Sequence, residues 1–168
     1  MTDKAKRCVE WVMRREGGYI NDLDDPGGET AFGISKRSYP DVDIASLNPE
    51  RAAEIYWRDF WSPVRGDAFE EPLALAMLDY AIHSGTARPI RELAVMMGLP
   101  RNAGIDAILE RLPEVPDQGV VAIQMIVERA VFLVRRALVT PKQDKFARGW
   151  ITRMVELKRA VEAAPKGG

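Results

Sequence analysis

Cysteine and histidine are nearly absent from this sequence, which has one of each, Cys8 and His83. A single cysteine excludes a disulfide within the chain and a metal site of the Cys-x-x-Cys type. A single histidine with no serine and aspartate in a triad pattern around it does not support a Ser-His-Asp hydrolase. The sequence therefore predicts no metal and no cofactor.

Long uninterrupted apolar runs are also missing. The longest apolar stretch, residues 119–139, is broken by Glu128, Arg129, Arg135 and Arg136, which favours a buried helix over a membrane span. Residues 1–13 carry charges on both sides of a short mixed stretch and do not resemble a secretory signal peptide. We therefore expect a protein made in the cytoplasm, with no stable membrane insertion.

The chain has almost no net charge, with 24 basic and 25 acidic side chains. No overall field thus attracts it to nucleic acid, and no nucleic-acid partner is expected. The charge is uneven, because residues 1–84 carry 10 basic and 16 acidic side chains while residues 85–168 carry 14 and 9. This asymmetry would suit a polyanionic polymer, although solvated helix faces produce it as well.

The hydrophobic content of 46% is sufficient for one compact domain over residues 1–168 without disulfides. Glycine, proline and asparagine gather at residues 98–117, where a subdivision into residues 1–97 and 98–168 is conceivable. Residues 21–33, NDLDDPGGETAFG, are rich in turn formers and predict a loop or a small hairpin. Apolar spacing and stop signals predict a mainly helical fold, with helices near residues 3–15, 49–61, 72–84, 88–97, 118–139 and 143–163.

Glu16 stands at the predicted end of the first helix and is followed by Gly17 and Gly18. The helix dipole disfavours a carboxylate at that end and favours the protonated acid, the form that a general acid requires. The alternative is an ordinary surface glutamate. The glycines either cap the helix or, having no side chains, let a polymeric substrate approach the carboxyl group.

Further polar and aromatic residues have two interpretations each. Asp22, Asp24 and Asp25 are candidates for the second carboxylate of a glycoside hydrolase, but aspartates before Pro-Gly-Gly also hydrogen-bond to their own turn. Trp61, with the aromatic residues just before it, either stacks on sugars or packs in the core. Ser84 is a weak nucleophile candidate, and a hydrogen-bonding or substrate-contacting role is more economical for its neighbour His83.

Three short motifs follow one another near the start of the chain: Glu16-Gly17-Gly18-Tyr19, Asp25-Pro26-Gly27-Gly28, and Thr30 with Gly33-Ile34-Ser35. In this order they resemble the opening signature of glycoside hydrolase family 108, the N-acetylmuramidases of phages and bacteria. The resemblance continues through AAEIYWRDFW, LAMLDYAIHSG and FARGWITRM, and so covers most of the chain. It implies a lysozyme-like helical fold with a loop or β-hairpin beside the active site.

The resemblance also implies roles for individual residues. The essential glutamate of the family falls on Glu16. The spacing to Asp25 and Thr30 looks like that of phage-type lysozymes, in which an aspartate and a threonine position the attacking water. The positions expected to contact substrate are Gly18, Tyr19, Trp61, Asp79, His83 and Ser84.

The sequence departs from the family pattern in three places. Leu23 stands where proline is frequent, and His83 replaces the usual asparagine, which changes the donors and acceptors available to a sugar amide. Residues 91–108 lack the Leu-Gln and Asp-Gly elements that normally precede the peptidoglycan-associated segment of the family. These departures put the substrate preference in question and leave the catalytic loop intact.

The predicted activity is hydrolysis of the bond between N-acetylmuramic acid and N-acetylglucosamine in bacterial peptidoglycan, with Glu16 as the general acid. A lytic transglycosylase is one alternative, and a noncatalytic peptidoglycan-binding or phage structural protein of the same fold is another. The enzyme would act in the periplasm or cell wall. A holin or a secretion system is the expected partner for its release.

Overall fold

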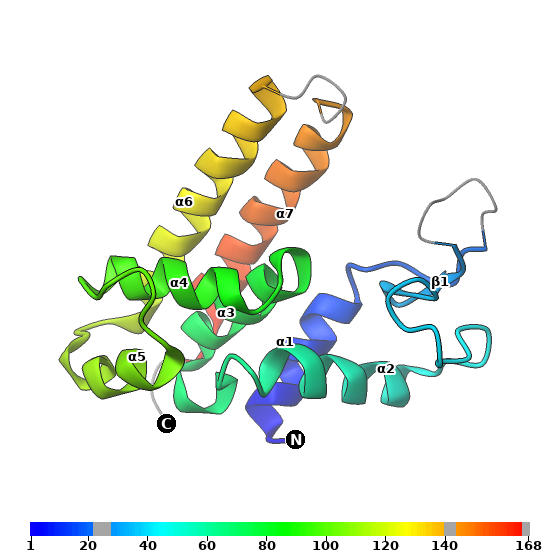
Figure 1. The fold of residues 1–168 in the computed structure, drawn as a ribbon, viewed down its shortest axis with the longest axis horizontal. Helices are drawn as coiled ribbons and strands as arrows, with labels where there is room; N and C mark the ends of the chain where they lie inside the picture. Colours follow the sequence, from blue (N-terminus) through cyan, green and yellow to red (C-terminus); the bar gives the residue numbers. More distant parts are fainter. Residues whose placement is uncertain (22–27, 140–143, 166–168) are drawn as a thin grey trace. The chain divides into compact units, whose positions relative to one another are not determined.

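The computed structural model describes residues 1–21, 28–139 and 144–165, which form mainly helices (Figure 1). The chain divides into two compact units, Met1–Pro63 and Val64–Gly168. The division falls between Pro63 and Val64, a different place from the subdivision considered at residues 97 and 98. The assignment of residues 1–168 to one domain stays a prediction, and each unit is described by itself below.

The helices of the first unit begin where capping residues stand in the sequence. Thr2 Oγ1 accepts a hydrogen bond from the Ala5 amide at 3.2 Å at the start of α1. Asn48 Oδ1 accepts one from the Arg51 amide at 2.8 Å at the start of α2. Each cap satisfies an amide that has no partner within its helix. The helical elements of this unit are α1 (Asp3–Met13), α2 (Pro49–Tyr56) and η1 (Trp57–Trp61).

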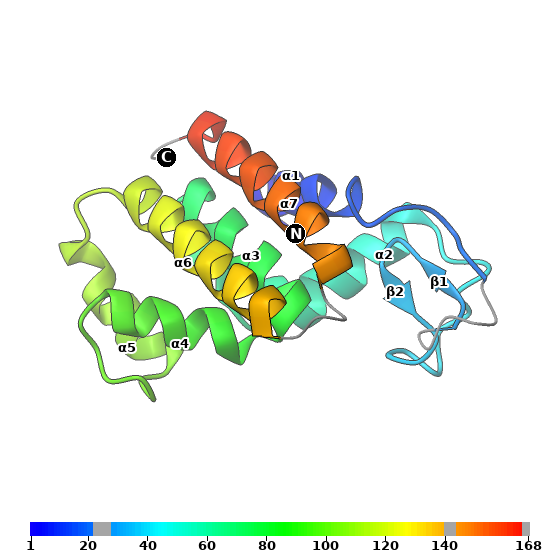
Figure 2. The same cartoon turned by 90° about the horizontal axis from the view of Figure 1, so that it is seen from above.

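The predicted hairpin is present and is very short. Strand β1 (Thr30–Ala31) pairs antiparallel with β2 (Ile34–Ser35), and the two lie side by side in Figure 2. Phe32 and Gly33 between them have φ values of 51° and 75°, the left-handed pair that a two-residue type I′ turn requires. Ile20 and Thr30 also exchange two backbone hydrogen bonds of 2.8 Å. These bonds tie the hairpin to the segment that follows Glu16.

The helix predicted to run through Trp61 changes its pitch after Tyr56. Residues Trp57–Trp61 form a π-helical turn, η1, in which the Ser62 amide donates to the Trp57 carbonyl oxygen at 2.8 Å. The wider turn alters which side chains face the core: Trp61 is fully buried, while Trp57 keeps 36% of its surface exposed. Single π-turns occur frequently at functional sites.

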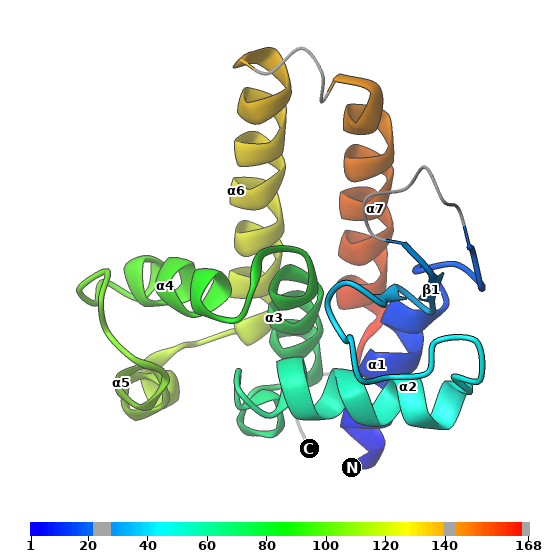
Figure 3. The same cartoon turned by 45° about the vertical axis from the view of Figure 1, so that its right-hand side comes forward.

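In the second unit, α3 (Glu71–Ser84) is the central helix. Its side chains are buried without a break from Pro72 to Ala81. Helices α6 and α7 lie side by side in both Figure 1 and Figure 3, and both contact α3. The other elements of this unit are η2 (Gly66–Ala68), α4 (Ala87–Met96), α5 (Ile105–Arg111), η3 (Leu112–Glu114), α6 (Gln118–Val139) and α7 (Asp144–Ala163).

Two details of the second unit differ from the prediction. The short helix α5 lies within residues 98–117, where the sequence predicted no helix, and it is stabilised by burial of Ile108, which local composition does not reveal. Helix α6 is buried only along one face of its first half, and Val127, Val134 and Leu138 are exposed. Within the described ranges, no helix has the length and hydropathy that a bilayer crossing needs.

Candidate active site

Glu16 follows the last turn of α1, as the sequence predicted. The helix ends at Met13, and the Glu16 amide donates a hydrogen bond to the Met13 carbonyl oxygen at 3.2 Å. Gly17 then takes a φ of 80°, a left-handed conformation that glycine adopts at little cost and that turns the chain away from the helix axis. The Glu16 side chain is half-buried, so it is not the fully solvated glutamate of the alternative interpretation.

The turn of the hairpin lies directly against the Glu16 carboxyl group. A methyl group on Gly33 would lie 2.9 Å from Glu16 Oε2, 2.8 Å from Glu16 Cβ and 2.7 Å from Tyr56 Oη. Real side-chain carbons essentially never come closer than 3.0 Å to other atoms, so only glycine fits here without movement of its neighbours. The fold therefore packs the backbone of Gly33 directly against the Glu16 side chain.

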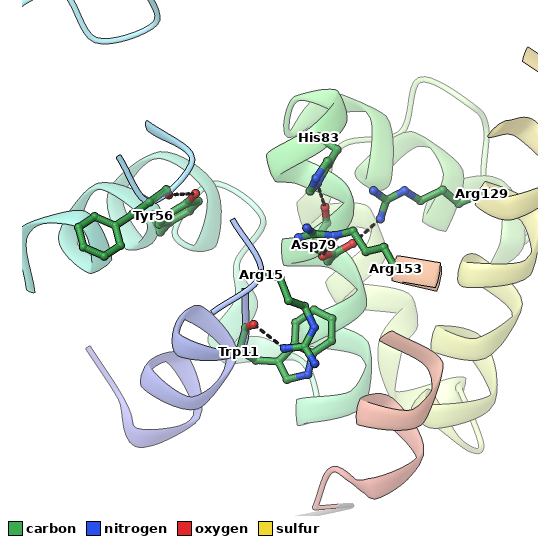
Figure 4. Close-up of polar contacts among 8 residues, drawn as sticks. Trp11, Arg15, Tyr56, Asp79, His83, Arg129 and Arg153 are labelled. Atoms are coloured by element: carbon green, nitrogen blue, oxygen red, sulfur yellow. Dashed lines mark hydrogen bonds and ion pairs between the residues drawn. The ribbon is translucent and has the colours of Figure 1, made fainter. Parts of the chain in front are cut away.

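Tyr56 holds this turn in place. Its buried hydroxyl group donates a hydrogen bond to the Phe32 carbonyl oxygen at 2.7 Å (Figure 4). Phe32 has a positive φ of 51°, which is uncommon and costly for a bulky residue and persists only where surrounding contacts enforce it. The hydrogen bond from α2 is such a contact. Tyr56 is thus a positioning residue that the sequence assigned only to a sugar-stacking wall or to the core.

Arg15, next to Glu16 in the chain, is folded back onto α1. Its guanidinium carbon lies 3.7 Å from the centre of the Trp11 ring, and Nη1 donates to the Trp11 carbonyl oxygen at 2.9 Å (Figure 4). A cation at a helix C-terminus interacts favourably with the helix dipole, and stacking on the indole adds a cation–π contribution. The Arg15 side chain therefore supplies a hydrogen-bond donor to a carbonyl oxygen in the last turn of α1.

The remaining predicted residues of the first unit lie around the hairpin. Tyr19 is 52% exposed, and its hydroxyl donates to Glu29 Oε1 at 2.7 Å. The pKa of Tyr19 is raised, chiefly because Glu29 accepts this hydrogen bond. Gly18 is exposed, and Thr30 Oγ1 is 3.2 Å from the Gly28 carbonyl oxygen. Asp25 lies outside the described residues, so its role and the substrate contacts of Gly18 and Tyr19 stay predictions.

Trp61 and Asp79, which were both predicted to contact substrate, have no exposed surface in the structure, and their contact with substrate stays a prediction. Trp61 turns into the core because the π-helical turn before it shifts the buried face. Asp79 is enclosed because it lies in the middle of α3, the most deeply buried helix. Packing therefore buries both residues that the resemblance placed in the site.

Asp79 is the centre of a buried ion cluster that joins three helices (Figure 4). Its Oδ2 accepts from Arg129 Nη1 of α6 at 2.6 Å, and its Oδ1 accepts from Arg153 Nε of α7 at 2.8 Å. Burial by itself would raise the pKa of Asp79, but the charges of Arg129 and Arg153 outweigh it and lower the pKa below 3.8. Sequence reasoning missed both arginines, although an aspartate inside an apolar helix requires cationic partners.

His83 and Ser84 lie at the last turn of α3, and both are exposed. His83 Nδ1 is 3.0 Å from the Asp79 carbonyl oxygen, which fixes the orientation of the ring (Figure 4). Both side chains are therefore accessible in the second unit, and their contact with substrate stays a prediction.

Gly33→Ala is expected to lower the rate of glycan cleavage by about ten- to hundred-fold, because the methyl group must displace the turn or Glu16. It is also expected to cost about 1–2 kcal/mol of stability from the positive φ. The matched control is Gly98→Ala, since Gly98 has a φ of 72° and no atom within 4 Å of an added methyl group. Rate and thermal unfolding are measured for both variants. Equal rates would show that the close approach at residue 33 does not matter for cleavage.

The chain is similar to known proteins both in sequence and in fold. Residues 9–85 match the family described as Glycosyl hydrolase 108. The structure resembles that of SagA from Brucella abortus with a TM-score of 0.76 and 24% sequence identity, over 98% of this chain and 97% of that chain. No curated protein matches the chain.

The fold likeness extends over both units and confirms the mainly helical, lysozyme-like fold predicted from the sequence. The family match covers the last five residues of α1, the hairpin, α2 and α3, and it includes Glu16, Gly33 and Tyr56. Residues 9–85 thus match the glycosyl hydrolase 108 family, the family that the motifs of the sequence predicted.

Proposed function

We propose that the protein hydrolyses the bond between N-acetylmuramic acid and N-acetylglucosamine in bacterial peptidoglycan, with Glu16 as the general acid. The observation that supports this most strongly is the close approach of the Gly33 backbone, which has no side chain, to the Glu16 carboxyl group. A proton donor has to come within hydrogen-bond distance of the glycosidic oxygen. Glu16 is half-buried, and a glycine, the residue that takes up the least space, lies against it, which supports its role as that donor.

In the proposed reaction, Glu16 donates its proton to the glycosidic oxygen as the bond from the sugar C1 to that oxygen breaks. A second group is then needed on the opposite face of the sugar to activate water or to attack C1. Asp25 with Thr30 is the proposed pair, on the resemblance to phage-type lysozymes. Water supplies the hydroxyl group of the new reducing end, and its proton goes to Asp25 when Asp25 acts as the base or to Glu16 when Asp25 has attacked C1. In the first case, proton exchange with solvent returns Asp25 and Glu16 to their starting forms.

The exposed residues Gly18, Tyr19, His83 and Ser84 are the proposed substrate contacts. Tyr19 offers a ring face of which half is open, and such faces pack on the CH groups of sugars. His83 offers a ring nitrogen where the family usually has an amide, so it suits a different hydrogen-bond partner on the sugar.

Digestion of purified peptidoglycan followed by mass analysis of the products tests the activity. Hydrolysis gives muramic acid with a reducing end, whereas a lytic transglycosylase gives the anhydro form, which is one water lighter. We expect reducing ends. Anhydro ends would indicate that the protein is a transglycosylase and not a hydrolase. Binding to the cell wall without release of any new sugar end would favour a noncatalytic protein.

Action on peptidoglycan requires that the enzyme reach the periplasm or the cell wall. We propose that a holin or a secretion system releases it, on the resemblance to phage and bacterial muramidases. Expression with and without a coexpressed holin tests this proposal, and we expect cell lysis only when both are present. Lysis that needs no holin would contradict release by that route.

A further inference from the structure

A cleft of about 630 Å³ lies between α4 and α6 in the second unit, with Tyr80 of α3 among its lining residues. Its volume is in the range of small-molecule sites. Five arginines and two glutamates line it, so its surface is strongly basic. Glu16 is not part of this cleft.

Two of the arginines are already paired. Arg129 binds Asp79, and Arg101 Nη2 is 3.2 Å from Glu92 Oε1. The other three, Arg88, Arg91 and Arg135, form no ion pair with any residue that the structure describes. Because a guanidinium group favours two-pronged contact with a carboxylate or phosphate, three uncompensated arginines on one cleft indicate an anionic ligand.

Arg91 and Arg88 are held in the cleft in different ways. The Nε atom of Arg91 is buried, and its hydrogen is donated to no acceptor in the part of the chain that the structure describes. A buried donor without a partner is costly, and a bound ligand oxygen would remove that cost. The Arg88 guanidinium carbon lies 4.5 Å from the centre of the Phe132 ring, which holds the side chain over the cleft wall.

The cleft is not basic throughout. Glu128 of α6 also lines it and forms no ion pair among residues 28–139 and 144–165. Val95, Met96 and Val131 supply apolar surface beside it. A ligand that satisfies all these groups carries carboxylates for the arginines, a cationic amine for Glu128 and a short aliphatic portion between them. Inorganic phosphate and fully anionic polymers lack the amine and meet repulsion from Glu128.

We propose that this cleft binds a short acidic peptide that carries at least two free carboxylates and one free amine. The inference does not depend on the glycosidase activity, because the cleft and Glu16 share no residue. Two sources share this chemistry: the peptide stems of peptidoglycan and acidic peptides unrelated to the wall.

Calorimetric titration of the full chain tests the proposal with three probes. They are the stem tripeptide Ala-γ-Glu-diaminopimelate, tri-glutamate, and citrate, which has carboxylates but no amine. We expect saturable binding of at least one peptide, tighter than that of citrate. Arg91→Gln and Arg135→Gln should each weaken peptide binding by about ten-fold or more, the usual effect of losing a charge-assisted hydrogen bond. Arg159→Gln, on an exposed part of α7 outside the cleft, should leave it unchanged.

The variant Glu128→Gln tests whether the Glu128 carboxylate contacts the ligand or only supports the structure of the cleft. It should weaken binding of the peptides and strengthen binding of citrate, because it removes the partner of the amine and the repulsion of the carboxylates. Arg135 is exposed, so its variant reports on binding even if Arg91→Gln fails to fold. The proposal is overturned if neither peptide binds, if citrate binds as tightly as the peptides, or if Arg135→Gln has no effect.

The peptide that binds with the lower dissociation constant shows whether the ligand comes from the peptidoglycan stems or from other acidic peptides. Either result supports a peptide-binding site in this cleft. Glu16→Gln should bind the peptides as wild type does. The absence of wall cleavage would therefore contradict the glycosidase proposal and leave the peptide-binding proposal standing. The absence of peptide binding would contradict the peptide-binding proposal and leave the glycosidase proposal standing.

Discussion

Glu16→Gln is expected to slow the cleavage of purified peptidoglycan by about 10² to 10⁴-fold, the usual contribution of general acid catalysis. Glutamine has nearly the shape of glutamate but carries no carboxylic proton to give to the glycosidic oxygen. Because the packing of residue 16 against Gly33 is retained, thermal unfolding should be close to that of wild type. The rate is measured as reducing ends released per enzyme molecule.

The matched control for this variant is Glu10→Gln, on the same helix. The Glu10 carboxyl group is exposed and 4.0 Å from Arg14 Nη1, so its loss should leave the cleavage rate unchanged. A Glu16→Gln variant that cleaves at the wild-type rate would remove Glu16 from the role of acid. Loss of rate in both variants would point to a general effect on α1 instead of proton transfer.

Asp79→Ala is expected to destabilise the second unit by about 3–5 kcal/mol, the typical cost of removing one partner from a buried ion cluster. The variant leaves the guanidinium groups of Arg129 and Arg153, which are 5% and 15% exposed, without their counter-charge. It also loses the contact that joins α3 to α6 and α7. The measurement is denaturant unfolding of the full chain followed by its helical circular dichroism signal.

The control for Asp79→Ala is Asp106→Ala, which breaks an ion pair of 2.9 Å with Arg65 that is largely exposed on both sides. Exposed pairs contribute about 0–1 kcal/mol, so this variant should remain close to wild type. Equal effects of the two substitutions would show that burial of the Asp79 cluster adds nothing to stability.

The pH dependence gives a second test of the Asp79 cluster. The folded-state pKa of Asp79 is below its ordinary value of 3.8, so its contribution to stability is complete above that pH. The contribution disappears as the pH falls through the lower folded-state pKa. The stability difference between wild type and Asp79→Asn should therefore be constant near neutral pH and shrink below about pH 4. A difference that grows on acidification would contradict an ionised Asp79.

The helices could be predicted from the sequence because their signals are local. Apolar residues at helical spacing, the caps Thr2 and Asn48, and the stop at Gly17-Gly18 all act within a few residues of where they stand. The π-helical turn after Tyr56 and the short helix α5 could not be predicted in this way. Both depend on which side chains the core accepts, as Trp61 and Ile108 show.

The candidate site was predictable only in part. Glu16 stands out because its position at a helix end and the glycines after it are local features. The approach of Gly33 and the hydrogen bond from Tyr56 to Phe32 join residues far apart in the chain, and no local pattern marks them. The resemblance assigned substrate contact to Asp79 and Trp61, but a sequence motif does not distinguish a buried structural residue from an exposed one.

The sequence by itself determined the mainly helical architecture, the short hairpin and the candidacy of Glu16, since helix periodicity, turn residues and motif order are properties of neighbouring residues. Only the tertiary structure decided that a glycine turn lies against that carboxyl group, that Asp79 binds Arg129 and Arg153, and that the arginines of α4 and α6 line one cleft. The physical reason is that burial, ion pairing and close backbone approach depend on which distant segments pack together.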